Sequence, residues 1–342
     1  MTGTTTPIDA VLFISFGGPE GPDDVLPFLE NVLRGRNVPR ERMLEVAEHY
    51  LHFGGVSPIN AQIRELIAAV REDFQQNGVS LPIYWGNRNW HPLLPAAMQE
   101  MTAAGVRRAL GFVVSAYSSY SSCRQYRENI EAARQACGEN APTVEKIRVF
   151  YNHPDFIAAN VDRLQESLAQ LTPSQRERVV VAFTAHSIPQ SMADTSDYVQ
   201  QLSETMRLVA EAHGIPPERR QLVYQSRSGR PQDPWLAPDI GDHLRSLHTA
   251  GVTDVIINPI GFLSDHMEVL FDLDLEAADI SRELGLNMIR TKTVGTHSRF
   301  VTMIRKLIQE RINAVRAGEC VGQFGPAACR ENCCLPPARP RA

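Results

Sequence analysis

The segment AVLFISF, residues 10–16, followed at once by GGP at residues 17–19, decides the fold class of this chain. Nearly every residue of the first part is apolar, without the polar alternation of a strand that faces water. Such a run is typical of a strand in a parallel sheet that is covered on both faces. The two glycines and the proline end the strand, and an amphipathic stretch follows from about Asp23.

Short apolar runs of the same kind recur along the chain and alternate with amphipathic stretches. The further runs lie at Ile83–Trp85, Gly111–Ser115, Ile147–Tyr151, Val179–Thr184, Leu222–Gln225, Val255–Ile260 and Met288–Thr291. Helical patterns between them include Ile59–Phe74, Pro154–Leu171, Val199–Ala212 and Pro238–Thr249. This alternation predicts an α/β protein built from βαβ units with parallel sheets.

The eight predicted strands divide into four and four. We therefore predict two doubly wound domains, at residues 1–153 and 154–316, each a four-stranded parallel sheet flanked by helices. A Cys- and Pro-rich tail without periodicity follows at residues 317–342. Ligands of such sheets bind outside the carboxyl ends of the strands, so we expect the active site in a cleft between the domains.

Composition narrows the class of protein. With 342 residues the chain can bury two cores, and 43% hydrophobic with 21% charged residues is typical of a soluble globular protein. The net charge of −5 gives no support for nucleic-acid binding. We find no run of about 18 apolar residues and no signal-peptide pattern in the first 30 residues. We expect a cytoplasmic protein without a membrane span.

His186 is the first candidate for chemistry. It follows a β-branched strand and precedes Ser187, Ile188 and Pro189, so it is expected at the mouth of the cleft. A neutral imidazole binds Fe²⁺ or Zn²⁺ and titrates near neutral pH. A histidine held by a hydrogen bond in an ordinary loop would give the same pattern.

A line of acidic residues is the second candidate. Glu268, Asp272 and Glu276 are spaced i, i+4, i+8 and so share a helix face, which Asp265 and Asp279 extend. No Lys or Arg occurs between residues 246 and 281 to relieve the repulsion. A favourable helix N-terminus explains only the first acidic residues. An acidic path that guides a divalent cation explains the rest better than a solvated face does.

Three further segments could contact a ligand. Trp235 follows a polar strand end at residues 224–229 and could stack on a flat apolar ligand, although a Trp that fills a domain interface would look the same. The segments at residues 54–60 and 118–126 precede helices, and their hydroxyl and N–H groups could bind carboxylates. They could also cap helices, which is the simpler interpretation for any one of them and which Ser57 is suited to do.

Together these segments resemble the ferrochelatase family. The resemblance is carried by Phe16-Gly17-Gly18-Pro19, His49-Tyr50, Gly54-Gly55-Val56-Ser57-Pro58, Thr184-Ala185-His186-Ser187-Ile188-Pro189, Gln225-Ser226-Arg227, Pro234-Trp235-Leu236 and Gly261-Phe262 through Asp274. These motifs are colinear from about residue 10 to residue 315. Each alone is weak, whereas their spaced combination is specific.

The resemblance implies two Rossmann-like, chelatase-type domains that enclose a porphyrin, and a lyase that inserts Fe²⁺, its metal substrate. His186 and Glu268 are similar to the family's metal-site pair and are the expected catalytic residues. Asp272 and Glu276 match its acidic helix line, and both are expected to contact the metal. Ser57 and Tyr126 occupy positions that contact the porphyrin in bacterial relatives, and we add Trp235 to the expected substrate-binding residues.

The missing membrane-binding lip is similar to the bacterial branch that uses coproporphyrin III and forms Fe-coproporphyrin III in haem biosynthesis. Phe16 departs from some bacterial relatives, which have a metal-coordinating Tyr there. Alternatives are a protoporphyrin IX ferrochelatase, a cobalt or sirohydrochlorin chelatase, and a haem-binding or redox-sensing protein without turnover. A carrier would have no need of an acidic path. We expect a monomer whose partners are porphyrin and Fe²⁺.

Four of the six cysteines fall in the last 23 residues: Cys320, Cys329, Cys333 and Cys334. This tail is similar to that of ferrochelatases that carry a [2Fe–2S] cluster, and cysteine thiolates are the usual ligands of such clusters. The fourth ligand could be the second member of the adjacent pair or Cys123. A tail that binds Zn²⁺, or no metal, is the alternative.

Overall fold

The computed structural model describes residues 7–35, 38–228, 232–317 and 332–336. These residues form two compact units. Unit 1 contains described residues from 7–115, 125–148 and 301–317, and unit 2 those from 116–124, 149–300 and 332–336. The chain passes from unit 1 to unit 2 after Ser115, back to unit 1 at Gln125, and again to unit 2 at Val149. The predicted domains are consecutive segments of the chain. In the structure, residues 116–124 belong to unit 2, and the chain returns to unit 1 at Val301.

Unit 1 is built on a four-stranded parallel sheet with the order β2-β1-β3-β4. Its strands are β1 (Ala10–Ser15), β2 (Ile83–Asn87), β3 (Arg108–Val113) and β4 (Thr143–Lys146). All six residues of β1 are buried, as the unbroken apolar run predicts for a central strand. In the register Phe13 lies opposite Phe112, and their ring centroids are 5.1 Å apart.

The fourth strand of unit 1 corrects the prediction of a strand at Ile147–Tyr151. β4 ends at Lys146, and its residues are partly or fully exposed because it lies at the edge of the sheet. In this edge strand of sequence TVEK, Val144 is the residue that packs against the apolar cluster of unit 1, so the strand lacks an apolar run. Ile147 continues the pairing by a single hydrogen bond from its N–H to the carbonyl of Gly111, at 2.9 Å.

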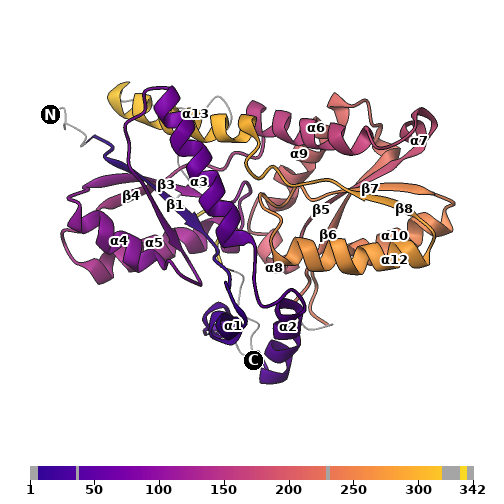
Figure 1. Cartoon of the computed structure of the whole chain (residues 1–342), viewed down its shortest axis with the longest axis horizontal. Coiled ribbons are helices and arrows are strands. Elements are labelled where there is room, and N and C mark those ends of the chain that lie inside the picture. The colour runs from indigo at the N-terminus through magenta and orange to yellow at the C-terminus, as the bar shows by residue number, and fades with distance from the viewer. Residues whose placement is uncertain (1–6, 36–37, 229–231, 318–331, 337–342) are drawn as a thin grey trace. The chain divides into compact units, whose positions relative to one another are not determined.

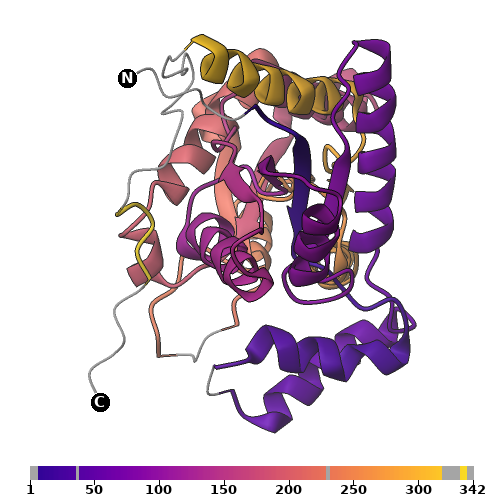
Figure 2. The same ribbon diagram turned by 90° about the vertical axis from the view of Figure 1, so that its left-hand side faces the viewer.

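Helices cover both faces of this sheet. Figure 1 shows α3 (Ile59–Gln76) and α13 (Ser298–Ala317) on one side and α4 (Leu94–Ala103) and α5 (Gln125–Cys137) on the other. Arg305 of α13 pairs with Asp73 of α3 at 2.6 Å, and both side chains are 15% exposed, which joins the returning chain to this unit. In Figure 2 the indigo helices α1 (Val25–Leu33) and α2 (Arg40–His52) project from the sheet of unit 1.

Unit 2 repeats the plan with the order β6-β5-β7-β8, again all parallel. Its strands are β5 (Val180–His186), β6 (Arg220–Gln225), β7 (Asp254–Asn258) and β8 (Asn287–Arg290). The predicted fold class, with two four-stranded parallel sheets flanked by helices, is confirmed. Since β6 and β7 lie on opposite sides of β5, the strand order reverses at β5, and ligands of such sheets bind at the carboxyl end of this position.

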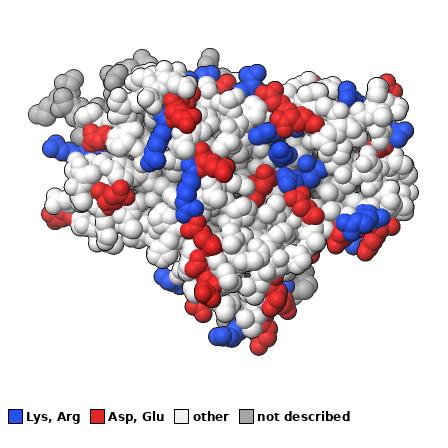
Figure 3. Space-filling view, in the orientation of Figure 1, with Lys and Arg blue, Asp and Glu red and all other residues white. Residues whose placement is uncertain are grey.

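Figure 1 shows α6 (Pro154–Leu168) and α9 (Tyr198–Ala212) over one face of the second sheet. The other face carries α10 (Ile240–Thr249) and α12 (Ala278–Glu283). On the face drawn in Figure 3 uncharged residues take up most of the area, and groups of Lys and Arg lie beside groups of Asp and Glu. None of the described helices combines the length and the apolar content that crossing a bilayer requires.

Candidate active site

His186 is the last residue of β5, at the carboxyl end of the sheet of unit 2. The strand residues before it are buried, whereas the His186 side chain is 33% exposed. Two bonds fix the backbone here: the Tyr198 hydroxyl donates to the carbonyl of His186 at 3.0 Å, and the N–H of Ser187 donates to the carbonyl of Gln225 at 2.7 Å. The strand therefore presents the imidazole as the sequence predicts.

The two ring nitrogens of His186 have different neighbours. Nδ1 contacts the carbonyl oxygen of Ser187. Because a carbonyl can only accept, Nδ1 carries a proton. Nε2 lies 3.4 Å from Oε1 of Glu268. The structure thus brings the two predicted catalytic residues together, although 82 positions separate them in the sequence.

The backbone N–H and the backbone carbonyl of Glu268 are both held by neighbouring side chains. Its N–H donates to Nδ1 of His266 at 3.2 Å, which makes His266 the N-cap of the short helix α11 (Met267–Val269). Its carbonyl accepts a hydrogen bond from Nε2 of Gln225 at 3.1 Å. These contacts leave the carboxylate free to face His186.

Charge and burial act in opposite directions on this pair. Burial lowers the pKa of His186, but the charge and hydrogen bond of Glu268 outweigh it, with the Ser187 carbonyl and Asp272 adding to the effect, so the pKa is raised. Burial raises the pKa of Glu268, but the adjacent His186, helped by His266, lowers it to about 2. At neutral pH the carboxylate is therefore ionised, and the pair favours a protonated imidazole.

Asp272 lies next along the acidic line and has a different environment. Burial raises its pKa to about 7; Glu268 and Glu276 add to the rise, and a hydrogen bond from Ser226 opposes it. The donor is the Ser226 hydroxyl, from a residue whose φ of 62° lies in the left-handed region. Burial, followed by the charge of Asp239, also raises the pKa of Glu276. Asp272 can thus gain or lose a proton near neutral pH.

The helix that carries this line is not the continuous α-helix that the spacing suggested. After α11 the chain forms the π-helix η4 (Leu270–Ala277) and then α12. Wider turns of this kind are frequent at functional sites. The three acidic residues still influence one another, because both Glu268 and Glu276 raise the pKa of Asp272.

Two arginines pair with the outer acidic residues: Arg290 from β8, which the local sequence did not reveal, and Arg282 from the same helix as Asp279. Arg290, at the end of β8, lies 2.5 Å from Asp265 and 2.7 Å from Asp274. Arg282 pairs with Asp279 at 2.6 Å. Asp265 and Asp279 are therefore paired with arginines, and within the described part of the chain the acidic residues of the line without such an arginine pair are Glu268, Asp272 and Glu276.

Trp235 lies in the segment of residues 232–236, which follows β6 in the chain. Its segment forms an antiparallel bridge with Pro189, and the N–H of Leu236 donates to the carbonyl of Ile188 at 3.1 Å. The Ser187 hydroxyl donates to the carbonyl of Leu236 at 2.9 Å. The structure thus holds Trp235, which is partly exposed, against the residues that directly follow His186.

The other two predicted substrate contacts, Ser57 and Tyr126, lie in unit 1. Ser57 is 5% exposed and adjoins Gly18, where an added Cβ would come within 2.7 Å of the Ser57 Cβ. It does not cap a helix, because the N-cap of α3 is Pro58. Tyr126 is 6% exposed within an apolar cluster. Arg88 lies 5.7 Å from its ring centroid, and burial raises the pKa of Tyr126 to about 12.

Two of the predicted cluster ligands, Cys320 and Cys329, lie outside the described residues. Cys334 is 4% exposed, and Cys123 in the body of unit 2 is 0% exposed. Arg124, next to Cys123, donates to the carbonyl of Cys333 at 3.2 Å. Within the described ranges, no three His, Cys, Asp or Glu side chains are grouped so that they could hold a metal ion. The described thiols therefore do not by themselves form a metal site.

Comparison with known proteins identifies the family. The sequence model of the ferrochelatase family matches residues 8–312. A ferrochelatase of Rhodopirellula baltica is 55% identical over 338 residues, covering 98% of this chain and 95% of its own. The chain belongs to the ferrochelatase family. A coproporphyrin III ferrochelatase of Streptomyces coelicolor is 49% identical, covering 98% of this chain and 94% of its own. The predictions of a ferrochelatase and of a lyase of the metal-chelatase class are confirmed.

Solved structures agree on the fold of this ferrochelatase. The structure of SirB from Bacillus subtilis with Fe³⁺ aligns with a TM-score of 0.56 at 11% identity, covering 91% of this chain and 98% of that chain. A sirohydrochlorin chelatase SirB in complex with cobalt aligns with a TM-score of 0.54 at the same identity. At such low identity the likeness supports the chelatase-type fold alone.

The sequence did not single out the residues that hold the backbone of His186 and Glu268. Gln225, His266 and Tyr198 fix the backbone of His186 and Glu268 through single hydrogen bonds. The first two lie within the motifs that carried the resemblance. Tyr198 lies in no motif, and no periodicity signals a hydroxyl that reaches back 12 residues to a strand end.

Proposed function

We propose that this chain inserts Fe²⁺ into coproporphyrin III to give Fe-coproporphyrin III. The observation that carries the proposal is the His186–Glu268 pair, with Nε2 and Oε1 3.4 Å apart at the carboxyl end of β5. The acidic Asp272 and Glu276 follow along the same segment. The substrate is suggested by the names of the Streptomyces relatives.

Insertion requires that two pyrrole N–H protons leave while iron loses its water ligands. We assign the iron contact to Glu268, because its lowered pKa keeps it ionised at neutral pH. We assign proton transfer to His186, whose Nε2 faces this carboxylate. An arriving cation repels the imidazolium and favours loss of its proton, so the iron substrate prepares the base that accepts a pyrrole proton.

Asp272 and Glu276 are proposed to deliver the iron substrate. With a pKa of about 7, Asp272 can exchange a proton for a cation at little cost near neutral pH. Iron contact by Glu268 and iron delivery by Asp272 and Glu276 should affect different kinetic constants. Glu268→Gln should lose nearly all kcat, whereas Asp272→Asn and Glu276→Gln should mainly raise KM for Fe²⁺. Equal losses of kcat in all three variants would contradict this order.

The choice of porphyrin is tested by direct competition. Purified protein and Fe²⁺ are mixed anaerobically with coproporphyrin III, protoporphyrin IX or both, and products are separated by chromatography. We expect kcat/KM to favour coproporphyrin III by at least tenfold, about 1.4 kcal/mol in activation free energy. A preference for protoporphyrin IX, or insertion of Co²⁺ into sirohydrochlorin alone, would replace the proposal with one of the alternatives.

Trp235 is the best supported of the proposed porphyrin contacts, because it forms a β-bridge with Pro189, three residues after His186. Ser57 and Tyr126 are retained as porphyrin contacts, although the burial of Tyr126 favours a packing role. Trp235→Ala should raise KM for coproporphyrin III by about tenfold through lost stacking area. Tyr126→Phe should leave this KM within about twofold if the phenol serves packing, and raise it if the hydroxyl contacts the substrate.

We also propose that the tail holds a [2Fe–2S] cluster, with Cys320, Cys329, Cys333 and Cys334 as its thiol donors and Cys123 as the reserve. The Arg124 contact to Cys333 supports Cys123 in this role, since it ties the tail to the residue beside Cys123. Thr195 holds the tail further along, by donating to the carbonyl of Leu335 at 3.1 Å. When bound, a cluster supplies one-electron redox chemistry and cross-links the tail. The expected monomer and cytoplasmic location stand as predictions.

A further inference from the structure

Arg290 joins two carboxylates that lie on either side of Glu268 in the sequence. Its Nη1 donates to Oδ1 of Asp265 at 2.5 Å, three residues before Glu268. Its Nε and Nη2 donate to the two oxygens of Asp274, each at 2.7 Å, six residues after Glu268. The Arg290 side chain is 16% exposed, and the planar fork of its guanidinium is suited to hold both carboxylates at once.

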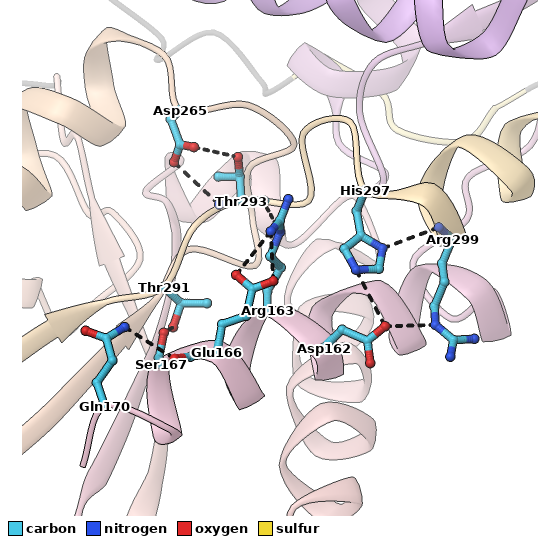
Figure 4. A network of polar contacts seen from close by, with 10 residues as sticks. All are labelled: Asp162, Arg163, Glu166, Ser167, Gln170, Asp265, Thr291, Thr293, His297 and Arg299. Carbon is cyan, nitrogen blue, oxygen red and sulfur yellow. Dashed lines mark hydrogen bonds and ion pairs between the residues drawn. The ribbon is translucent and has the colours of Figure 1, made fainter. Parts of the chain in front are cut away.

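A second side chain holds Asp265 from the loop that follows β8. The Thr293 hydroxyl donates to Oδ2 of Asp265 at 3.2 Å, and the Thr293 N–H donates to Oδ1 at 3.4 Å. Thr293 is 3% exposed, and its own carbonyl accepts a bond from Nε of Arg163 at 3.1 Å. Figure 4 shows this network running from α6, through Arg163 and Thr293, to Asp265.

The contacts reach Glu268 through a short stretch of backbone. Asp265 adjoins His266, whose Nδ1 accepts the N–H of Glu268 at 3.2 Å. On the other side, Gly295 donates its N–H to the carbonyl of Leu263 at 3.0 Å, so the loop after β8 holds the backbone before Asp265 as well. A displacement of Asp265 therefore moves the N-cap and the Glu268 carboxylate with it.

We propose that Arg290 and Thr293 are positioning residues for metal insertion: they hold Asp265 and Asp274, and through them the turn that carries Glu268. The inference rests on the proposed role of Glu268. Neither residue contacts the reacting atoms. Their effect is to keep the carboxylate facing His186, and misplacement of a catalytic group by about 1 Å can cost about a hundredfold in rate.

The chain offers matched controls for a merely structural effect. Thr291 is 0% exposed and lies two residues before Thr293, and its hydroxyl is bonded to that of Ser167 on α6 at 2.9 Å, away from Asp265. Arg178 pairs with Asp254 at 2.9 Å. Asp254 is the first residue of β7, so this pair lies at the amino end of the strands, opposite to the carboxyl end where His186 lies. Thr291→Val removes a buried hydroxyl bond, and Arg178→Lys alters an arginine–aspartate pair whose arginine is more exposed than Arg290, at 58%. Neither substitution removes any of the described side-chain bonds to Asp265 or Asp274.

The test measures anaerobic Fe²⁺ insertion into coproporphyrin III by the full chain, with urea unfolding in parallel. Arg290→Lys and Thr293→Val should each lower kcat by about tenfold and leave KM for the porphyrin within about twofold. Thr293→Ser, which restores the hydroxyl, should recover kcat to within about twofold. Thr291→Val and Arg178→Lys should keep kcat near that of the unchanged chain even where they lose as much stability.

Equal kcat in Thr293→Val and Thr291→Val, or a Thr293→Ser variant as slow as Thr293→Val, would overturn the inference. If Thr293→Val does not fold, Arg163→Gln replaces it, and an unchanged kcat there would count against the inference. Glu268→Gln is measured beside them. If it retains its activity, the proposed function of Glu268 fails; if it is inactive while the other variants match their controls, only the positioning role fails.

Discussion

Asp272→Asn should make the protein relatively more stable as the pH rises, because it removes a carboxylate that ionises at a cost. The folded pKa of about 7 lies above the ordinary value of 3.8. As the pH rises between these values, the unfolded chain loses the proton while the folded chain keeps it. Stability therefore falls through this window and levels off above pH 7.

The magnitude follows from the width of the window. Two pH units between pH 5 and the folded pKa correspond to about 2.7 kcal/mol. Asp272 keeps some exposure, so solvent screening reduces this figure. We expect the variant to gain about 1–2 kcal/mol over the unchanged chain between pH 5 and pH 8, measured by urea unfolding without iron.

Asp279→Asn is the control on the same segment. Its carboxylate is 49% exposed and pairs with Arg282, so its loss should change the unfolding free energy by under about 0.5 kcal/mol at both pH values. The reasoning would be refuted if Asp272→Asn and Asp279→Asn showed the same pH dependence. It would also be refuted if Asp272→Asn lost stability relative to the unchanged chain on going from pH 5 to pH 8.

Three further predictions concern the chemistry. His186→Ala should abolish metal insertion while coproporphyrin III still binds by fluorescence quenching; retention of more than about a tenth of kcat would rule out the assigned role. Activity at saturating substrate should fall as the pH drops through the raised pKa of His186, since the protonated imidazole cannot accept a pyrrole proton; a profile that is flat on the acid side would contradict this. Anaerobically purified protein should contain iron and acid-labile sulfide, and Cys333→Ser should lower both while Cys137→Ser, in unit 1, leaves them unchanged; zinc without sulfide would indicate a structural zinc site instead.

The sequence by itself determined the fold class. A strand buried on both faces is mostly apolar, so β1, β5 and β7 are visible as the apolar runs Ala10–Ile14, Val180–Phe183 and Val255–Ile257. Their alternation with amphipathic helices indicates parallel sheets. The same logic failed for β4, because an edge strand has no such requirement. His186 was predictable since it directly ends one of these runs.

Only the tertiary structure decided which polar groups act together. His186 and Glu268 meet because two strand ends lie side by side, and no local pattern encodes a contact across 82 positions. Likewise Arg290 removes Asp265 from the acidic line that the spacing had suggested. Burial, which raises the pKa of Asp272 to about 7, depends on neighbours brought from distant segments and not on the residue's own place in the chain.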